Sequence, residues 1–222
     1  MDELTLVIPA KNEAETLPTV LEDLKKYELK IIIVLEESDI KTINAIKDFD
    51  CKILYQTEVG YGDALIKGIQ SVNSKYFCIF NADGSFLSKE LSQMYKNIKQ
   101  DNIDFVFGSR YMKNGYSEDD TLITLIGNRI FSFLGKLLFN LNISDILYTF
   151  VMGDTQKAKD LNMQEKDFAF CVEMPIKAKK AGHILISIPS YEKPRIAGRK
   201  KVNAFKDGLM ILISMLKLLF SR

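Results

Sequence analysis

The chain has few of the residues that build metal clusters and disulfide frameworks, since its 222 residues include three cysteines and one histidine. Cys51, Cys78 and Cys171 lie far apart, and the first two stand in or beside apolar, strand-like runs. This spacing is typical of reduced core thiols in a cytosolic setting, and it matches no zinc-binding pattern. His183 precedes a predicted strand and is assigned no chemistry.

The chain also lacks an excess of either charge, because 30 lysines and arginines face 29 aspartates and glutamates. This balance argues against a general affinity for nucleic acid. The basic residues nevertheless gather late in the chain, between Lys177 and Lys201. The first residues, Met-Asp-Glu, lack the basic and apolar segments of a signal peptide. We therefore expect the protein to stay in the cytoplasm.

No internal repeat, low-complexity tract or linker rich in Pro, Gly or Ser divides the chain. A length of 222 residues suits one domain with a full core, so we predict a single domain over residues 1–222. The first half alternates short β-rich runs with helical patterns, which is typical of a three-layer α/β fold with a mostly parallel central sheet. Strands are predicted near 4–9, 30–35, 51–55, 76–80 and 104–108, and helices near 13–26, 39–49, 62–73 and 88–99.

The second half contains two strongly apolar helices, predicted near residues 121–141 and 203–220. Each has one narrow polar face: Asn128, Ser132, Lys136 and Asn140, flanked by Arg129, in the first, and Asn203, Asp207, Ser214, Lys217 and Ser221 in the second. A transmembrane span needs about 20 apolar residues, and the run before Phe220 is shorter and is broken by Lys217. The pair favours contact with a membrane interface. The alternative is that both are ordinary core or dimer helices.

A short acidic turn, Asn81-Ala82-Asp83-Gly84-Ser85, follows the apolar run that ends at Phe80. Ligands of α/β sheets bind at such strand ends. Asn81, Asp83 and Ser85 offer hard oxygen ligands for Mg²⁺ or Mn²⁺, and such a cation can neutralise a diphosphate leaving group. The turn therefore predicts a nucleotide site, although the same residues also suit a turn without any ligand.

Four further segments occur in a fixed order around this turn. They are Leu6 to Glu13, which runs from a strand into a helix start, Gly60 to Gly68, Gly108-Ser109-Arg110-Tyr111, and Tyr191 to Lys201. In this order and spacing the chain resembles the family 2 glycosyltransferases of the GT-A fold. Within that family it most closely resembles the branch that transfers hexoses to dolichyl or polyprenyl phosphate. The resemblance covers nearly the whole chain.

The resemblance implies a nucleotide-sugar site in the half formed by residues 1–110. Glu13 also suits a helix N-terminus, where a carboxylate complements the helix dipole. Glu36 stands where the family commonly has aspartate, and Asn81 replaces the first aspartate of an Asp-x-Asp motif, so one charge at the metal is lost. The implied donor site comprises Pro9, Ala10, Asn12, Glu13, Glu36, Gly60, Gly62, Asn81, Ala82, Asp83 and Lys201.

The same resemblance assigns the half formed by residues 111–222 to the acceptor. It implies that Arg110, Arg129 and Arg195 hold an acceptor phosphate, and that Asp83, Arg110, Glu173 and Arg195 are the catalytic residues. Glu173 matches a carboxylate that faces the donor sugar. Asp145 also matches a family position, but the arginine that follows it in the family is missing here. A basic stretch near Lys201 would also attract anionic lipid headgroups without any catalytic role.

The leading hypothesis is an inverting transferase that depends on Mg²⁺ or Mn²⁺. It moves a hexose from a nucleotide-sugar to a polyprenyl or dolichyl phosphate at the cytoplasmic face of a membrane. One alternative keeps the donor site but uses a glycan acceptor in polysaccharide synthesis. Another, suggested by the changes at Glu36 and Asn81, is an inactive, membrane-associated binding subunit. The donor sugar and its base stay open.

Overall fold

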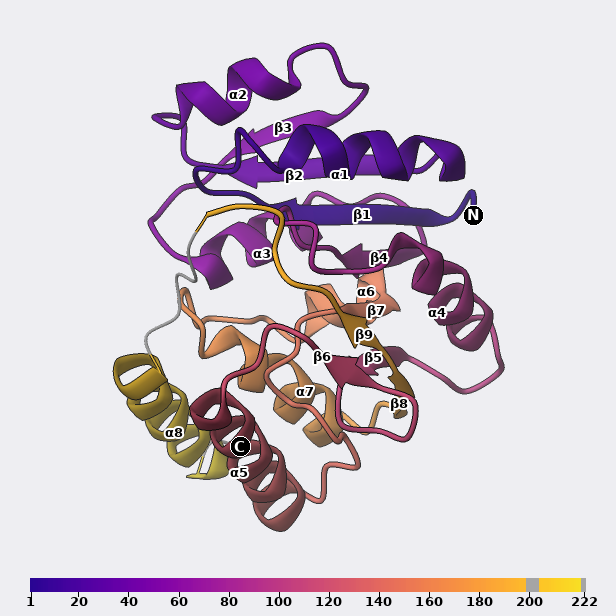
Figure 1. Cartoon of the computed structure of the whole chain (residues 1–222). Coiled ribbons are helices and arrows are strands. Elements are labelled where there is room, and N and C mark those ends of the chain that lie inside the picture. Colours follow the sequence, from indigo (N-terminus) through magenta and orange to yellow (C-terminus); the bar gives the residue numbers. More distant parts are fainter. Residues whose placement is uncertain (199–203, 221–222) are drawn as a thin grey trace.

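The computed structural model describes residues 1–198 and 204–220, and its core is a seven-stranded sheet with the order β3-β2-β1-β4-β7-β5-β8 (Figure 1). All neighbouring pairs are parallel except those of β7, which runs antiparallel to β4 and β5. The mostly parallel α/β fold predicted from the sequence is confirmed. The strands are β1 (Leu4–Pro9), β2 (Lys30–Leu35), β3 (Lys52–Tyr55), β4 (Tyr76–Ile79), β5 (Phe105–Ser109), β7 (Val151–Asp154) and β8 (Leu185–Pro189).

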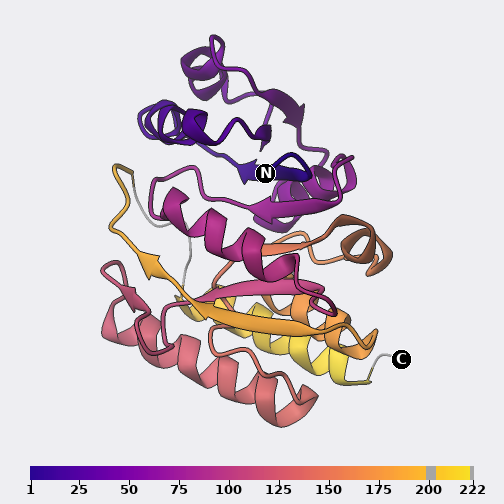
Figure 2. The ribbon, with the colours of Figure 1, turned by 90° about the vertical axis from the view of Figure 1, so that its right-hand side faces the viewer.

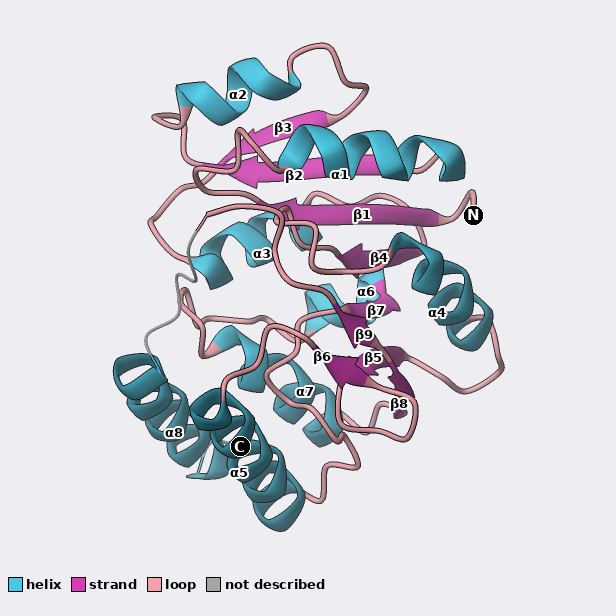
Figure 3. Ribbon diagram, in the orientation of Figure 1, coloured by secondary structure: helices cyan, strands magenta, loops and turns pink. Residues whose placement is uncertain are grey.

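Helices cover both faces of this sheet, as Figures 2 and 3 show. Successive residues of β1 point to opposite faces, so Leu6 and Ile8 join one core cluster with α1 and α4 while Val7 joins another with α3, α7 and α8. The helices are α1 (Leu17–Leu24), α2 (Ile40–Ile46), α3 (Tyr61–Gln70), α4 (Leu91–Ile98), α5 (Leu122–Phe139), α6 (Thr155–Asp160), α7 (Phe170–Lys180) and α8 (Ala204–Phe220), with short 3₁₀ turns η1 (Lys25–Tyr27) and η2 (Ser88–Glu90).

The two apolar helices of the second half, α5 and α8, pack against each other and against α7 (Figure 1). Two residues of the predicted polar stripe of α5, Asn128 and Ser132, point toward the protein, whereas Lys136 and Asn140 are exposed. Asn128 donates a hydrogen bond to the Tyr111 hydroxyl at 2.8 Å, and the Ser132 hydroxyl accepts one from the Ile146 amide at 3.1 Å. The apolar side of α5 faces outward, with Leu122, Ile123, Ile126, Ile130, Phe133 and Leu137 all exposed.

Helix α8 has apolar residues on both its buried and its exposed side. Ile211, Met215 and Leu218 are buried in the core, and the Ser214 hydroxyl donates to Glu165 at 2.9 Å. The predicted single polar face is therefore wrong for α8, because Ser214 is buried while Lys217 is exposed; Asn203 and Ser221 lie outside the described residues. The outward side of α8 exposes Phe205, Leu209, Ile213, Leu216 and Phe220.

Among the described residues, α5 is the one helix long and apolar enough to cross a membrane, and 11% of its 18-residue window is buried. Length and composition alone are weak evidence for a span. The exposed apolar sides of α5 and α8 are named here the outer face. A second, two-stranded sheet pairs β6 (Tyr116–Ser117) with β9 (Tyr191–Glu192) beside the end of β5.

Candidate active site

A cavity of about 640 Å³ opens at the carboxyl ends of the parallel strands. The strand order reverses at β1, because β2 and β3 lie on one side of it and β4 lies on the other. Ligands of α/β sheets bind at such a switch point. Residues at or just after the strand ends line the cavity: Pro9, Ala10, Lys11 and Glu13 at the end of β1, Glu36 after β2, Gln56 after β3, Asn81, Ala82 and Asp83 after β4, and Arg110 after β5.

The turn after β4 supplies one carboxylate of the cavity lining, that of Asp83. Asp83 is 9% exposed and its Oδ1 accepts the Ser85 amide at 3.0 Å. Asn81 Nδ2 donates to the Ser85 hydroxyl at 3.3 Å, so Asn81 Oδ1 is the atom left for a cation. Ser85 is buried and does not line the cavity, so its prediction as a direct metal ligand is not supported.

A segment over residues 193–196 lies across this turn. The Lys193 amide donates to the Ser85 carbonyl and the Ile196 amide to the Asp83 carbonyl, both at 2.9 Å. Gly84 has φ +79°, and a Cβ there would meet the Ile196 side chain at 2.4 Å, so the turn requires glycine. An Arg195 Nη2 atom lies 3.3 Å from Asp83 Oδ2, while the buried Arg195 Nε has no hydrogen-bond partner.

Four of the five donor-site residues predicted at the ends of β1 and β2 line the cavity. Pro9, Ala10 and Glu13 line the cavity, and Glu13 Oε2 accepts the Thr16 hydroxyl at 2.7 Å. Glu36 also lines it, in an ion pair with Lys11 at 2.6 Å. Asn12 is exposed and does not line the cavity, so a direct contact of its side chain with a nucleotide is not supported. Its backbone amide donates to Asp39 at 2.6 Å.

The glycines at the start of α3, Gly60 and Gly62, give room to another part of the chain's own backbone. A Cβ at Gly60 would lie 2.0 Å from the Lys166 carbonyl oxygen, and one at Gly62 would lie 2.2 Å from the Glu165 carbonyl oxygen. Gly60 lines the cavity and Gly62 does not. The predicted place of Gly62 at the donor site is therefore not supported, and both glycines leave space for the chain's own 165–167 backbone.

Alanine at Gly62 is expected to destabilise the protein by about 1–3 kcal/mol, because the carbonyl oxygens it meets are backbone atoms that can yield little. The matched control is Gly127 in α5, where a Cβ would meet nothing within 4 Å. Gly127→Ala is expected to stabilise by up to about 1 kcal/mol through helix propensity. Urea denaturation measures both changes, and equal effects at the two sites would contradict the packing of the 165–167 segment on α3.

Glu173, predicted to face the donor sugar, points away from the cavity. It is 2% exposed, and its two carboxylate oxygens accept the amides of Gln164 and Glu165 at 2.8–3.0 Å. Lys177 pairs with it at 2.7 Å. Because the carboxylate accepts these amides and does not line the cavity, its predicted catalytic role is not supported; it holds the 164–165 backbone that packs on α3.

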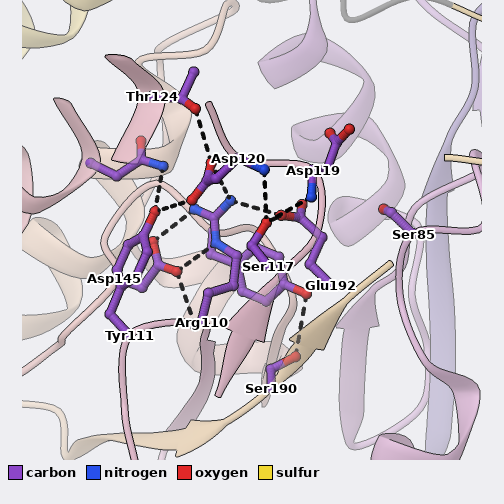
Figure 4. A network of polar contacts seen from close by, with 12 residues as sticks. Ser85, Arg110, Tyr111, Ser117, Asp119, Asp120, Thr124, Asp145, Ser190 and Glu192 are labelled. Carbon is purple, nitrogen blue, oxygen red and sulfur yellow. Dashed lines mark hydrogen bonds and ion pairs between the residues drawn. The ribbon is translucent and has the colours of Figure 1, made fainter. Parts of the chain in front are cut away.

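Arg110 lines the cavity but is enclosed by carboxylates (Figure 4). Its Nε and Nη2 donate to the two oxygens of Asp145 at 2.7 and 2.9 Å, and Nη1 donates to Glu192 at 3.0 Å. Asp120 lies 3.6 Å from Nη1. Burial raises the pKa of Glu192, against the lowering effect of Arg110, and Asp120 adds to the rise. The prediction that Arg110 binds the acceptor phosphate is not supported, because three of its N–H groups already donate to Asp145 and Glu192 and a third carboxylate, Asp120, lies beside it.

Arg129, which was also predicted to hold the acceptor phosphate, does not lie at the Asp83 turn as Arg195 does. Arg129 is exposed on α5, outside the cavity lining, with its guanidinium 5.7 Å from the centre of the Tyr111 ring. Its placement at an acceptor phosphate inside the cavity is therefore not supported. Lys201 lies outside the described residues. Of the three predicted arginines, Arg195 is the one that meets the Asp83 turn.

One wall of the cavity is apolar, and most of its side chains come from the second half of the chain. Tyr61 stacks on Phe168 with ring centres 5.1 Å apart, and Leu147, Cys171 and Ile211 complete the wall. Burial raises the pKa of the Cys171 thiol to about 12, so it stays neutral. Ile211 belongs to α8, so this wall reaches the helix that carries part of the outer face.

Several lining residues were not predicted from the sequence: Asp119, Asp120, Thr124, Asn128, Tyr148, Phe168, Ile211 and Glu192. Asp119 and Asp120 precede the Thr121 cap of α5 and look like ordinary helix-start acids. Glu192 stands inside the segment from Tyr191 to Lys201 that was singled out, which is the one signal that could have found it.

A mostly parallel α/β sheet with this acidic turn at its switch point defines a glycosyltransferase of the GT-A class. The family model "Glycosyl transferase family 2" matches residues 5–161, and the chain belongs to this family. It is 23% identical over 212 residues to an uncharacterized glycosyltransferase of Mycobacterium tuberculosis, across 96% of this chain and 95% of the relative. It is 22% identical over 219 residues to glycosyltransferase AglJ of Haloferax volcanii, across 96% of this chain and 71% of the relative.

The fold is shared with a solved enzyme, glucosyl-3-phosphoglycerate synthase from Mycobacterium tuberculosis. Its complex with Mn²⁺, UDP and glucosyl-3-phosphoglycerate matches with a TM-score of 0.74 at 12% identity, across 98% of this chain and 80% of that chain. Another of its structures contains Mg²⁺ and UDP. At this identity the likeness establishes the fold, while the branch of the family stays a separate question.

Proposed function

We propose that this glycosyltransferase moves a hexose from a nucleoside diphosphate sugar to a polyprenyl or dolichyl phosphate at the cytoplasmic face of a membrane. The observation that carries the proposal is the continuity of one cavity. Its floor is the Asp83 turn and its wall is the apolar group Tyr61, Phe168 and Ile211. A lipid phosphate has both characters, an anionic head and an apolar chain, and the cavity offers surfaces for both.

The donor would lie over the carboxyl ends of β1, β2 and β4. Asn81 and Asp83 would hold Mg²⁺ or Mn²⁺, which would compensate the charge of the diphosphate leaving group. The described residues contain no group of three or more His, Cys, Asp or Glu side chains suited to a metal. One carboxylate and one carboxamide are a sparse ligand set, so the cation depends on the diphosphate for further ligands. The metal complexes of the related synthase also contain UDP, which is consistent with a cation that binds together with a diphosphate.

The acceptor phosphate is already an anion and needs little deprotonation, so alignment and charge compensation dominate the reaction. Arg195 has the position for this task. Its Nη2 atom reaches Asp83, and its buried Nε has no partner, so a phosphate oxygen would satisfy that donor. The chain itself thus supplies a guanidinium beside the leaving group and an apolar wall for the first isoprene units.

The outer face of α5 and α8 supports the membrane part of the proposal. Water-exposed helices normally present polar residues outward, whereas on α5 Asn128 and Ser132 are bonded inward and the apolar side is exposed. A helix with this arrangement suits the interface of a bilayer, with its apolar side toward the acyl chains. The cavity wall ends at Ile211 on the inner side of the same helix α8.

A second candidate is transfer to a hydroxyl group of a glycan. Asp119, Asp120 and Glu192 line the cavity on the side of α5, which gives that side several carboxylates. A carboxylate near a hydroxyl acceptor can serve as a general base, which a phosphate acceptor does not need. This candidate keeps the donor site and leaves the outer face without a direct role.

Sugar transfer from radiolabelled UDP-glucose and GDP-mannose separates the two candidates. With a polyprenyl phosphate in detergent and Mn²⁺ present, label is expected in the organic-extractable fraction and is expected to be released by mild acid. Label that appears only in water-soluble glycans would overturn the lipid phosphate acceptor. Absence of transfer to either acceptor, with intact nucleotide binding, would favour an inactive binding subunit.

A further inference from the structure

Arg110 is a single cation surrounded by carboxylates. Its guanidinium contacts both oxygens of Asp145 and one oxygen of Glu192, with Asp120 nearby. Its backbone amide also donates to Asp145 at 3.1 Å. The Arg110 side chain is 8% exposed, and that of Asp145 is 0% exposed. A phosphate that approached this group would meet three carboxylates as well as the arginine. The geometry therefore suits a structural junction better than an anion site.

From Arg110 one line of contacts leads to the Asp83 turn. Glu192 also accepts the Ser117 hydroxyl at 2.5 Å, which joins β9 to β6. The next residue, Lys193, donates its amide to Ser85, and Ile196 donates its amide to Asp83. Arg195 lies between these two bonds with its guanidinium on Asp83. Glu192 is thus the last side-chain anchor before the chain crosses the turn.

A second line of contacts leads from Arg110 to α5. Asp120, beside the guanidinium, accepts hydrogen bonds from the Tyr111 hydroxyl at 2.6 Å and from Thr124 at 3.1 Å. The Tyr111 hydroxyl in turn accepts one from Asn128. Thr124 and Asn128 lie on α5, so the end of β5, the helix of the outer face and the strand β9 meet at one buried side chain (Figure 4).

We infer that Arg110 is a positioning residue that fixes β9 through Glu192 and thereby holds the 193–196 segment, with Arg195, on the Asp83 turn. It acts on the reaction through Arg195 and touches neither phosphate itself. The functional part of this inference rests on the proposed role of the Asp83 turn as the diphosphate site. The structural part, the hold on the segment, can be measured without any ligand.

Hydrogen–deuterium exchange at the Lys193 and Ile196 amides tests the structural part. Arg110→Lys keeps a charge but cannot form the bidentate contact and reach Glu192 as well. Glu192→Ala leaves Arg110 paired with Asp145, so it preserves folding if the lysine variant does not. Both variants are expected to exchange at least about 10-fold faster at these two amides, with unchanged protection in β2. The control, Glu22→Gln, removes a charge from the exposed pair with Lys25 and is expected to match the wild type.

A mutant cycle tests the functional part, with the affinities of UDP and GDP measured in the presence of Mn²⁺. Arg110→Lys is expected to weaken the bound nucleotide in the wild-type background and to add no further loss in Arg195→Ala. Additive losses, or unchanged exchange at residues 193 and 196 together with a raised KM for the lipid phosphate, would overturn the inference and make Arg110 a phosphate ligand. If the wild type binds neither nucleotide, the proposed donor site fails, while the exchange result still decides the hold on the segment.

Discussion

Asp83→Ala is expected to abolish Mn²⁺-dependent binding of UDP or GDP and to lower sugar transfer by about 10³-fold, the usual size of effect when a group that compensates transition-state charge is lost. Asp83 is the carboxylate of the turn that lines the cavity, and the Arg195 guanidinium already lies beside it. Isothermal titration with and without Mn²⁺ measures the binding. Unchanged nucleotide affinity in this variant would remove the turn from the donor site.

Asn81→Asp serves as the matched comparison at the same turn. It adds a charge beside the cation while keeping an oxygen ligand, so Mn²⁺ is expected to bind more tightly in the presence of the nucleotide. The new carboxylate cannot donate to the Ser85 hydroxyl as Asn81 does. A weaker metal complex in this variant would mean that the bond from Asn81 to Ser85 matters more than the added charge.

The double variant Ile130→Glu with Leu209→Glu is expected to leave the protein folded but to lower its binding to anionic lipid vesicles by at least about 100-fold. Burial of each such side chain contributes about 1.5–3 kcal/mol, and both contributions are lost together. The two side chains are 52% and 60% exposed, so the core is not disturbed. Vesicle flotation measures the binding, and UDP or GDP affinity measured in parallel reports the donor site.

The control for this experiment is Ile40→Glu on α2, which is 57% exposed and lies far from the outer face. It is expected to bind vesicles as the wild type does. Point variants are preferable to removal of α8, because truncation would take Ile211, Met215 and Leu218 out of the core. Equal vesicle binding by the double variant and the control would refute the membrane role of the outer face.

The order of helices and strands in the first half could be predicted from the sequence, because hydrophobic periodicity and turn residues are local signals. The strands β1 and β2 have the predicted bounds. The strand β7 could not be found this way: Val151 to Asp154 is a four-residue run, and its antiparallel place between β4 and β5 depends on partners far along the chain. The reversed faces of α5 were likewise hidden, since a polar stripe does not say which side meets the protein.

The candidate site was predictable where its residues follow strand ends, as with Glu36, Asn81 and Asp83. It was not predictable where a side chain's partner comes from tertiary structure. Glu173 has a sequence context that suits a pocket, yet the amides of the 164–165 segment occupy its carboxylate. Arg110 stands in a recognisable motif, but only the folded chain brings Asp145 and Glu192 to it.

The position of β7 has a consequence for how this chain can be divided. Its residues lie between β4 and β5 in the sheet, so among the described strands it alone joins the strands of residues 1–79 to β5 and β8. A fragment that ended near residue 110 would lack β7, so the edge of β4 would be unpaired and β5 would have no neighbouring strand in the fragment. Unpaired strand edges favour association with other chains. During synthesis β5 therefore cannot be joined to β4 until β7, which ends at Asp154, has emerged. A fragment of residues 1–110 is therefore expected not to fold as an independent unit.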